Sequence, residues 1–290
     1  MNKLSKRRGI PGILLTSLVL CALLVPAAMP EPVSADNPSP FATEVVSFNG
    51  PFGPSPYDDP NAVLGKPTTK FKDPYTSPPD ERVKLVEPAW NVGLSDEPLI
   101  VTLNEGAQIT VKFDHQVLDD PDNPYGIDLL VFGNSFFTGD GWVSDETDMN
   151  SYMLTGGGFF ENIKVSVSQD GVNWYRYESG PYGDDMFPTQ AYLWDRANAQ
   201  WTDTEMDWTK PVNPSLTIDD FNGISAADAI DLYDGSAGGA GFDLAESGYA
   251  WIQYVRVEGL SGFCGGEIDA FADVAPICPD WDVNQDGSIN

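Results

Sequence analysis

Short runs in which apolar and polar residues alternate one by one constrain most strongly how this chain folds. The clearest runs are residues 109–113, 163–168 and 268–274. A period of two is typical of a β-strand that buries one face and leaves the other in water. In the last run, the four apolar residues are predicted to share one face, opposite Asp269 and Asp273.

Apolar and aromatic-rich runs predict further strands at 41–48, 99–103, 127–132, 174–177 and 251–257. A single helix is predicted at 226–233, after a shortened capping box formed by Ser225 and Asp228 and before Gly235. The 28 glycines and 24 prolines favour turns over long helices. This pattern predicts an all-β fold, an antiparallel two-sheet β-sandwich of the jelly-roll kind with long loops and one short helix.

The first 35 residues have the pattern of a secretory signal peptide. Four basic residues among the first eight precede an apolar run at 13–25, which is shorter than the roughly 20 residues that span a bilayer. Cleavage fits after Ala28 or after Ala35, and Ala35 is preferred because a Pro-rich stretch follows. We therefore expect residues 1–35 to be removed, no integral membrane span after cleavage, and a secreted or cell-surface protein. The alternative is a single membrane anchor.

Export would place Cys264 and Cys278 in a compartment that permits disulfides. The strand predicted between them is roughly 20 Å long at about 3.3 Å per residue, whereas bridged Cα atoms lie within about 7 Å. A bridge therefore requires the strand to bend. Pairing with a partner beyond Asn290 and free thiols are the alternatives.

The net charge is strongly negative, with 44 acidic and 15 basic residues giving −29. Such a chain repels phosphate backbones and anionic lipids, so nucleic acid is a poor partner and cations are favoured. The only histidine, His115, is the one base available to a nucleophilic triad, and a structural role is favoured for it. No carboxylate pair is singled out for glycoside hydrolysis. Whether the protein is an enzyme stays open, with binding preferred.

Three segments resemble the last strands of discoidin-type, galactose-binding-like jelly rolls: 165–174, 254–257 and 267–271. A longer resemblance, to a family of exported bacterial cell-surface proteins without an assigned biochemical role, rests on 58–68, 113–115, 125–134 and 234–244. These resemblances imply a galactose-binding-like β-sandwich domain over residues 36–276 and export from the cell.

The galactose-binding-like resemblance also implies a structural calcium, which such domains often bind between an N-terminal loop and the acid that opens the last strand. Asp59, or its neighbour Asp58, and Glu267 match these positions. The alternative for Asp59 is turn and cap chemistry before Pro60.

Asp128 is a further metal candidate because it interrupts the apolar run at 127–132. A carboxylate in a buried strand needs a partner or an ion. The alternative is that alternation turns Asp128 outward to water. The acidic cluster at 119–123 is a second candidate in the same region.

The C-terminal residues match the first nine positions of a calcium-binding loop. Oxygen-bearing side chains or carbonyls are supplied by Asp282, Asn284, Asp286, Ser288 and Asn290, with a glycine at the sharp turn. The loop resembles that of a type I dockerin, which implies a cohesin-type scaffold as partner. The sequence stops before the bidentate acid, so we expect residues 277–290 to be a truncated dockerin- or EF-hand-like calcium loop that continues beyond Asn290. The alternative is a disordered acidic terminus.

Two long segments, 50–95 and 180–222, are predicted to be irregular, and loops of this length are usually functional or held in place by ligands or metal. Four tryptophans in irregular segments are candidate stacking platforms for sugars: Trp142, Trp194, Trp201 and Trp208. The alternative is that these rings pack beneath the loops as satellite cores.

We therefore expect an exported, non-catalytic β-sandwich that binds carbohydrate or extracellular matrix, with structural calcium and a dockerin-like tail. The alternatives are a secreted polysaccharide hydrolase, or accessory subunit, carried by a dockerin, and a passive structural surface protein. All three accommodate the acidic composition.

Overall fold

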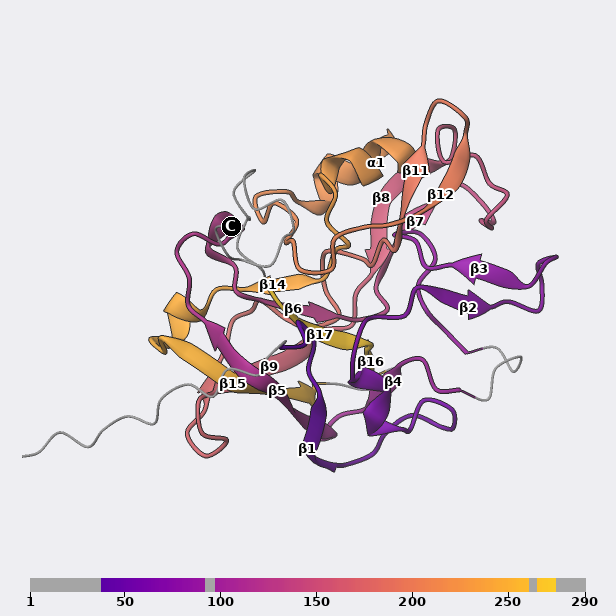
Figure 1. Ribbon diagram of the computed structural model, residues 1–290. Coiled ribbons are helices and arrows are strands. Elements are labelled where there is room, and N and C mark those ends of the chain that lie inside the picture. Colours follow the sequence, from indigo (N-terminus) through magenta and orange to yellow (C-terminus); the bar gives the residue numbers. More distant parts are fainter. Residues whose placement is uncertain (1–37, 92–96, 261–264, 275–290) are drawn as a thin grey trace, which may run out of the picture. The chain divides into compact units, whose positions relative to one another are not determined.

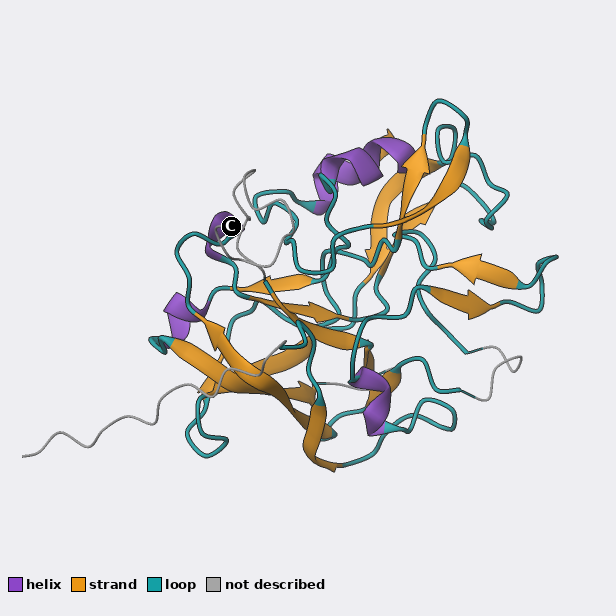
Figure 2. Ribbon diagram, viewed as in Figure 1, coloured by secondary structure: helices purple, strands orange, loops and turns teal. Residues whose placement is uncertain are grey.

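The computed structural model describes residues 38–91, 97–260 and 265–274, and within these ranges the chain is built mostly from antiparallel strands with one α-helix (Figures 1 and 2). These ranges all belong to one compact unit of the chain, Val33–Asn290. The predicted signal peptide, the predicted C-terminal calcium loop, Cys264 and Cys278 lie outside the described residues.

A five-stranded antiparallel sheet forms one layer. Its strands, in spatial order, are β1 (Glu44–Asn49), β5 (Gln108–Leu118), β15 (Trp251–Gly259), β9 (Ile163–Ser168) and β10 (Tyr175–Arg176). The strands predicted at 109–113, 163–168 and 251–257 are confirmed here. The predicted apolar face is buried in each strand, since Val111, Val165 and Val255 are all fully buried, but β9 is buried on its polar face as well.

The facing layer consists of a three-stranded sheet and an adjacent pair. The sheet is β14 (Ala240–Phe242), β6 (Leu129–Phe132) and β17 (Ala270–Asp273), and the pair is β16 (Gly266–Ile268) with β4 (Val101–Leu103). Leu129, Val131 and Phe271 share one hydrophobic cluster with the inner face of the five-stranded sheet. Two sheets that enclose a common apolar cluster make a β-sandwich-like architecture.

The continuous strand predicted at 268–274 is wrong, because the chain breaks at Asp269 into β16 and β17. The Asp269 carboxylate accepts hydrogen bonds from the backbone N–H of Thr68, at 2.8 Å, and from its hydroxyl, at 3.0 Å. Because of this break, the side chains before and after Asp269 enter different cores. Ile268 lies in the sandwich core, whereas Ala270 and Ala272 lie in a second core.

This second core covers the outer face of β6, so that strand is buried on both sides, with Leu130 and Phe132 turned away from the sandwich core. The elements that cover it are β7 (Phe136–Gly139), β8 (Met153–Phe159), β13 (Asn222–Ser225), β11 (Tyr192–Asp195), β12 (Gln200–Glu205), β2 (Lys70–Lys72), β3 (Asp80–Arg82) and α1 (Ala226–Leu232). Figure 1 shows α1 and β11–β12 gathered beside β7 and β8, apart from the five-stranded sheet.

The two long segments expected to be irregular therefore contain regular structure. The first holds the β2–β3 hairpin and the second holds the β11–β12 hairpin. Four short 3-10 helices complete the described elements: η1 (Pro60–Val63), η2 (Pro124–Gly126), η3 (Ile218–Phe221) and η4 (Leu244–Ser247).

Helix α1 confirms the helix prediction and its capping signal. The Ser225 hydroxyl accepts a hydrogen bond from the Asp228 backbone N–H at 3.1 Å and donates to the Asp228 carboxylate at 2.7 Å. The Asp228 carboxylate also accepts the backbone N–H of Ser225 at 3.3 Å, so the capping box satisfies one backbone N–H from each residue at the start of the helix. The buried face of α1 includes Ala226, Ala229 and Ile230.

Candidate functional site

The structure separates the four candidate tryptophans. Trp194 and Trp208 are buried in the second core, at 8% and 7% exposure, and Trp201 packs edge-on against Trp194 at a ring distance of 4.9 Å. Trp194 and Trp208 therefore belong to the second core, and Trp201 is partly buried against it. Trp142 is different, because 67% of it is exposed.

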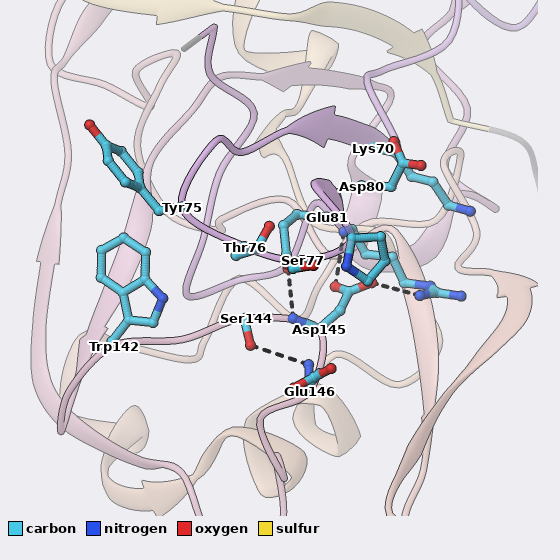
Figure 3. A pocket seen from close by; sticks show the side chains of 12 residues that line it. Lys70, Tyr75, Thr76, Ser77, Asp80, Glu81, Trp142, Ser144, Asp145 and Glu146 are labelled. Atoms are coloured by element: carbon cyan, nitrogen blue, oxygen red, sulfur yellow. Dashed lines mark hydrogen bonds and ion pairs between the residues drawn. The ribbon is translucent and has the colours of Figure 1, made fainter. Parts of the chain in front are cut away.

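Trp142 stands at the mouth of a cleft of about 570 Å³ between the β2–β3 hairpin and residues 144–146 (Figure 3). Tyr75, at the tip of the hairpin, is 74% exposed, and its ring meets that of Trp142 at 90° with the centroids 6.2 Å apart. The two rings stand together on one side of the cleft in Figure 3, with Lys70 and Asp80 across from them. The structure thus adds Tyr75 to the candidate site. Sequence reasoning missed it because its neighbourhood shows no periodicity.

A buried ionic network forms the base of this cleft. The Lys84 ammonium is fully buried and lies 3.3 Å from a carboxylate oxygen of Glu81 and 3.3 Å from one of Asp145. It also pairs with Glu87. The Asp145 backbone N–H donates to Glu81 at 2.6 Å, so residue 145 is fixed against β3. The wall of the cleft is held by charge-assisted hydrogen bonds, which are about twice as strong as neutral ones.

Arg82 extends the network at the edge of the cleft. Its guanidinium donates to Asp145 at 2.6 Å and to Asp203 at 3.2 Å. Burial acts to raise the pKa of Asp145, but Lys84 and Arg82 outweigh it and the pKa is lowered. Asp145 therefore stays ionised and paired.

An apolar cleft of about 520 Å³ adjoins the first, and Trp142 borders both. Its lining includes Trp90, Phe136, Tyr152 and Glu87. Burial raises the pKa of Glu87 to about 7, against the opposing effect of Lys84. A carboxyl group with that pKa is able to give or take a proton near neutral pH.

Glu267, the acid predicted to hold calcium, belongs to β16. Its side chain lies close to two acids from other segments that the sequence did not suggest. Carboxylate oxygens of Glu161, Asp184 and Glu267 all lie within 4.8 Å of one another. Asp184 is 1% exposed, and its carboxylate accepts the backbone N–H groups of Ser135, at 2.8 Å, and of Glu267, at 2.9 Å. Glu161 and Asp184 are far from Glu267 in sequence, so only tertiary structure brings the three together.

Electrostatics make this cluster a candidate cation site. Burial, and then the charge of Asp184, raise the pKa of Glu267. Within the described ranges, no basic side chain forms an ion pair with any of the three acids. Two unit charges 4.8 Å apart repel by about 3.5 kcal/mol at an effective dielectric constant of about 20. The three acids must therefore share protons or hold a cation. A hard divalent ion with oxygen ligands suits them.

The other two predicted calcium ligands of the described residues, Asp59 and Asp128, do not belong to the cluster around Glu267. The Asp59 carboxylate caps η1, accepting from the backbone N–H of Asn61 at 2.9 Å and from its side-chain amide at 3.0 Å. Asp128 is fully buried, so the alternative that it faces water is wrong. Its carboxylate lies in a second acidic group with Asp119 and Asp243.

His115 has a structural position. Its two ring nitrogens lie 2.8 Å from carboxylate oxygens of Asp114 and Asp273. Because His115 belongs to β5 and Asp273 to β17, this contact joins the two sheets of the sandwich. The candidate ligands Asp282, Asn284, Asp286, Ser288 and Asn290 lie outside the described residues.

Comparison of the chain with protein-family models, with curated proteins and with solved structures gives no match. Among the described elements, no helix has the length and apolar character needed to cross a membrane.

Proposed function

We propose that this chain is an exported, non-catalytic protein with a galactose-binding-like jelly roll that binds carbohydrate in the cleft beside Tyr75 and Trp142. The observation that carries the proposal is the pair of aromatic rings, 74% and 67% exposed, at the mouth of a polar cleft. Aromatic faces offer large apolar area at low conformational cost, which suits stacking against the C–H face of a sugar ring. A volume of about 570 Å³ lies within the range of small-molecule sites.

The polar lining supports a neutral glycan as ligand. Hydroxyl partners are available from Thr76, Ser77 and Ser144. Four carboxylates line the cleft against two basic side chains, and three of the four, all but Glu146, already pair with cationic side chains. Because most of these charges are already paired, the lining favours hydroxyl-bearing, neutral sugars over sulfated or uronic acid sugars.

Pairing also favours binding over hydrolysis in this cleft. Glycoside hydrolysis needs one carboxyl group that can donate a proton and a second that acts on the anomeric carbon or on water. Glu81 and Asp145 are instead held by Lys84 and Arg82. A hydrolase is the second candidate because Glu87, with its pKa raised to about 7, lines the adjoining cleft. Hydrolysis of a polysaccharide that is lost in Glu87→Gln would favour this second function.

Calcium and the tail complete the proposal. A structural calcium ion bound by Glu161, Asp184 and Glu267 would neutralise their mutual repulsion. The galactose-binding-like resemblance supports this position for Glu267. The dockerin-like residues 277–290 would attach the protein to a cohesin-type scaffold outside the cell.

A glycan array with the full-length protein tests the carbohydrate proposal. We expect retention of neutral oligosaccharides by the wild type and by Phe48→Ala, a control that removes another exposed ring, at 58% exposure. Trp142→Ala should weaken binding at least tenfold, which corresponds to about 1.4 kcal/mol. Equal retention by Trp142→Ala and the wild type, or no retained glycan at all, would contradict the proposal.

A further inference from the structure

Two segments that are distant in sequence bring a second set of oxygen ligands together, far along the chain from Glu267. Asp119 and Asn123 precede η2, and Asp128 stands immediately before β6. Asp243 occupies the turn between β14 and η4. Carboxylate oxygens of the three aspartates lie within 4.8 Å of one another. That spread equals about twice a calcium–oxygen bond of about 2.4 Å.

The side chain of Asn123 supplies an independent sign of a missing partner. Asn123 is 5% exposed, and its amide nitrogen donates to the Asp128 carboxylate at 2.9 Å. Its amide oxygen is buried and has no hydrogen-bond partner among the described residues. Buried polar atoms are nearly always satisfied, so this oxygen needs an explanation.

The Asn123 amide lies beside the aspartates, because its nitrogen is 2.9 Å from the Asp128 carboxylate. The unpaired oxygen belongs to the same amide group. Amide oxygens are among the ligands that calcium binds, so a cation held by the aspartates would supply the partner that this oxygen lacks.

The two carboxylate oxygens of Asp243 have different surroundings. Oδ1 accepts the backbone N–H of Ala245 at 2.8 Å and caps η4. Oδ2 points toward the segment that holds Asn123, because a Cβ atom on Gly126 would lie 3.7 Å from it. Gly126 has φ +72°, a conformation that glycine adopts without strain and that closes this turn.

The charge of the group is uncompensated. No ion pair joins Asp119, Asp128 or Asp243 to a basic side chain in the described part of the chain. The Asp128 carboxylate accepts hydrogen bonds from the backbone N–H groups of Asp120, at 3.1 Å, and Leu244, at 2.9 Å, but these groups carry no net positive charge. A divalent cation would supply the positive charge that protein groups do not.

We infer that this group is a second calcium site, separate from the glycan cleft and from the cluster around Glu267. Its four protein ligands are Asp119, Asn123, Asp128 and Asp243. Asp119 and Asp243 are partly exposed, so water completes the coordination shell. The ion ties the segment after β5 to the turn after β14.

Calorimetric titration of the chelator-treated, full-length protein with calcium chloride tests the site. Asp119→Asn and Asp243→Asn keep side-chain size and should each lose one calcium per chain or bind it at least tenfold more weakly. Asp122→Asn is the matched control, since it removes a charge from an exposed residue of the same loop outside the cluster. These variants keep Glu161, Asp184, Glu267 and the tail, so calcium bound there does not differ between them.

Asn123→Asp provides a second test whose sign depends on the ion. In chelator it adds a fourth carboxylate and removes the donor to Asp128, so the melting temperature should fall below that of the wild type. Calcium should then raise the melting temperature of this variant more than that of the wild type. Superimposable isotherms for all three Asp→Asn variants, or no uptake of calcium by the wild type, would overturn the inference.

Discussion

Lys84 is the residue whose replacement should change stability most clearly. Its side chain is fully buried, and its ammonium pairs with the carboxylates of Glu81, Glu87 and Asp145. Lys84→Met keeps the apolar stem but leaves the buried acids Glu81 and Glu87, and the partly buried Asp145, without their shared cation. Removing one partner of a buried ion pair costs about 3–5 kcal/mol. We expect a loss in that range in the free energy of unfolding at pH 8, measured by urea denaturation.

The loss should depend on pH with a defined sign. Burial already raises the pKa of Glu87 to about 7, above its ordinary value of 4.5, and removal of Lys84 would raise it further. The folded variant then binds more protons than the unfolded chain, so its stability falls as the pH rises through the folded pKa. The penalty should therefore be smaller at pH 5 than at pH 8.

Lys72→Met is the matched control. Lys72 pairs with Asp80 on the same hairpin, but its side chain is 45% exposed, and exposed pairs contribute about 1 kcal/mol or less. Equal losses for the two lysine variants, or a Lys84→Met penalty that does not change between pH 5 and pH 8, would refute the reasoning.

Three further measurements follow from the structure. His115→Asn should lower the free energy of unfolding by about 1.5–3 kcal/mol at pH 5.5. The bond to Asp273 raises the pKa of His115, so the stability that His115 contributes is complete below about pH 6.5 and is lost as the pH rises through the folded pKa. The loss measured by urea denaturation should therefore be larger at pH 5.5 than at pH 9. Ser225→Ala removes the cap of α1 and should cost about 1 kcal/mol in the same assay, with an unchanged value counting against the capping box. Chelator should lower the melting temperature by several degrees, since an ion present at about 100 times its dissociation constant stabilises the folded state by about 2.7 kcal/mol; an unchanged melting temperature would argue against bound calcium.

Local patterns predicted those parts of the fold that depend on local chemistry. The long strands β5 and β15 alternate along most of their length because each buries one face and leaves the other partly exposed, whereas β9 alternates in polarity although both of its faces are buried. The capping pair Ser225 and Asp228 marked the start of α1 because the two residues are only three positions apart and bond to each other. These features need no knowledge of which segment packs on which.

The rest depends on tertiary contacts. The break at Asp269 arises from its bonds to Thr68, 201 positions away, and β2 and β3 are only three residues long, too short for a periodic signal. Trp142 and Trp194 both lie in segments without clear periodicity, and only the packing of the second core decides which ring is exposed. Likewise, Glu267 stood out in the sequence, whereas its neighbours Glu161 and Asp184 did not.

Quenching of tryptophan fluorescence by acrylamide, with and without a neutral oligosaccharide selected on the array, tests the binding cleft most directly. Among the tryptophans in the described residues, Trp142 alone is largely exposed, at 67%. A sugar ring stacked on Trp142 should shield it, so the oligosaccharide should reduce quenching in the wild type and leave Trp142→Phe unaffected. Quenching that the oligosaccharide leaves unchanged in the wild type, or reduces equally in Trp142→Phe, would contradict a glycan site at Tyr75 and Trp142.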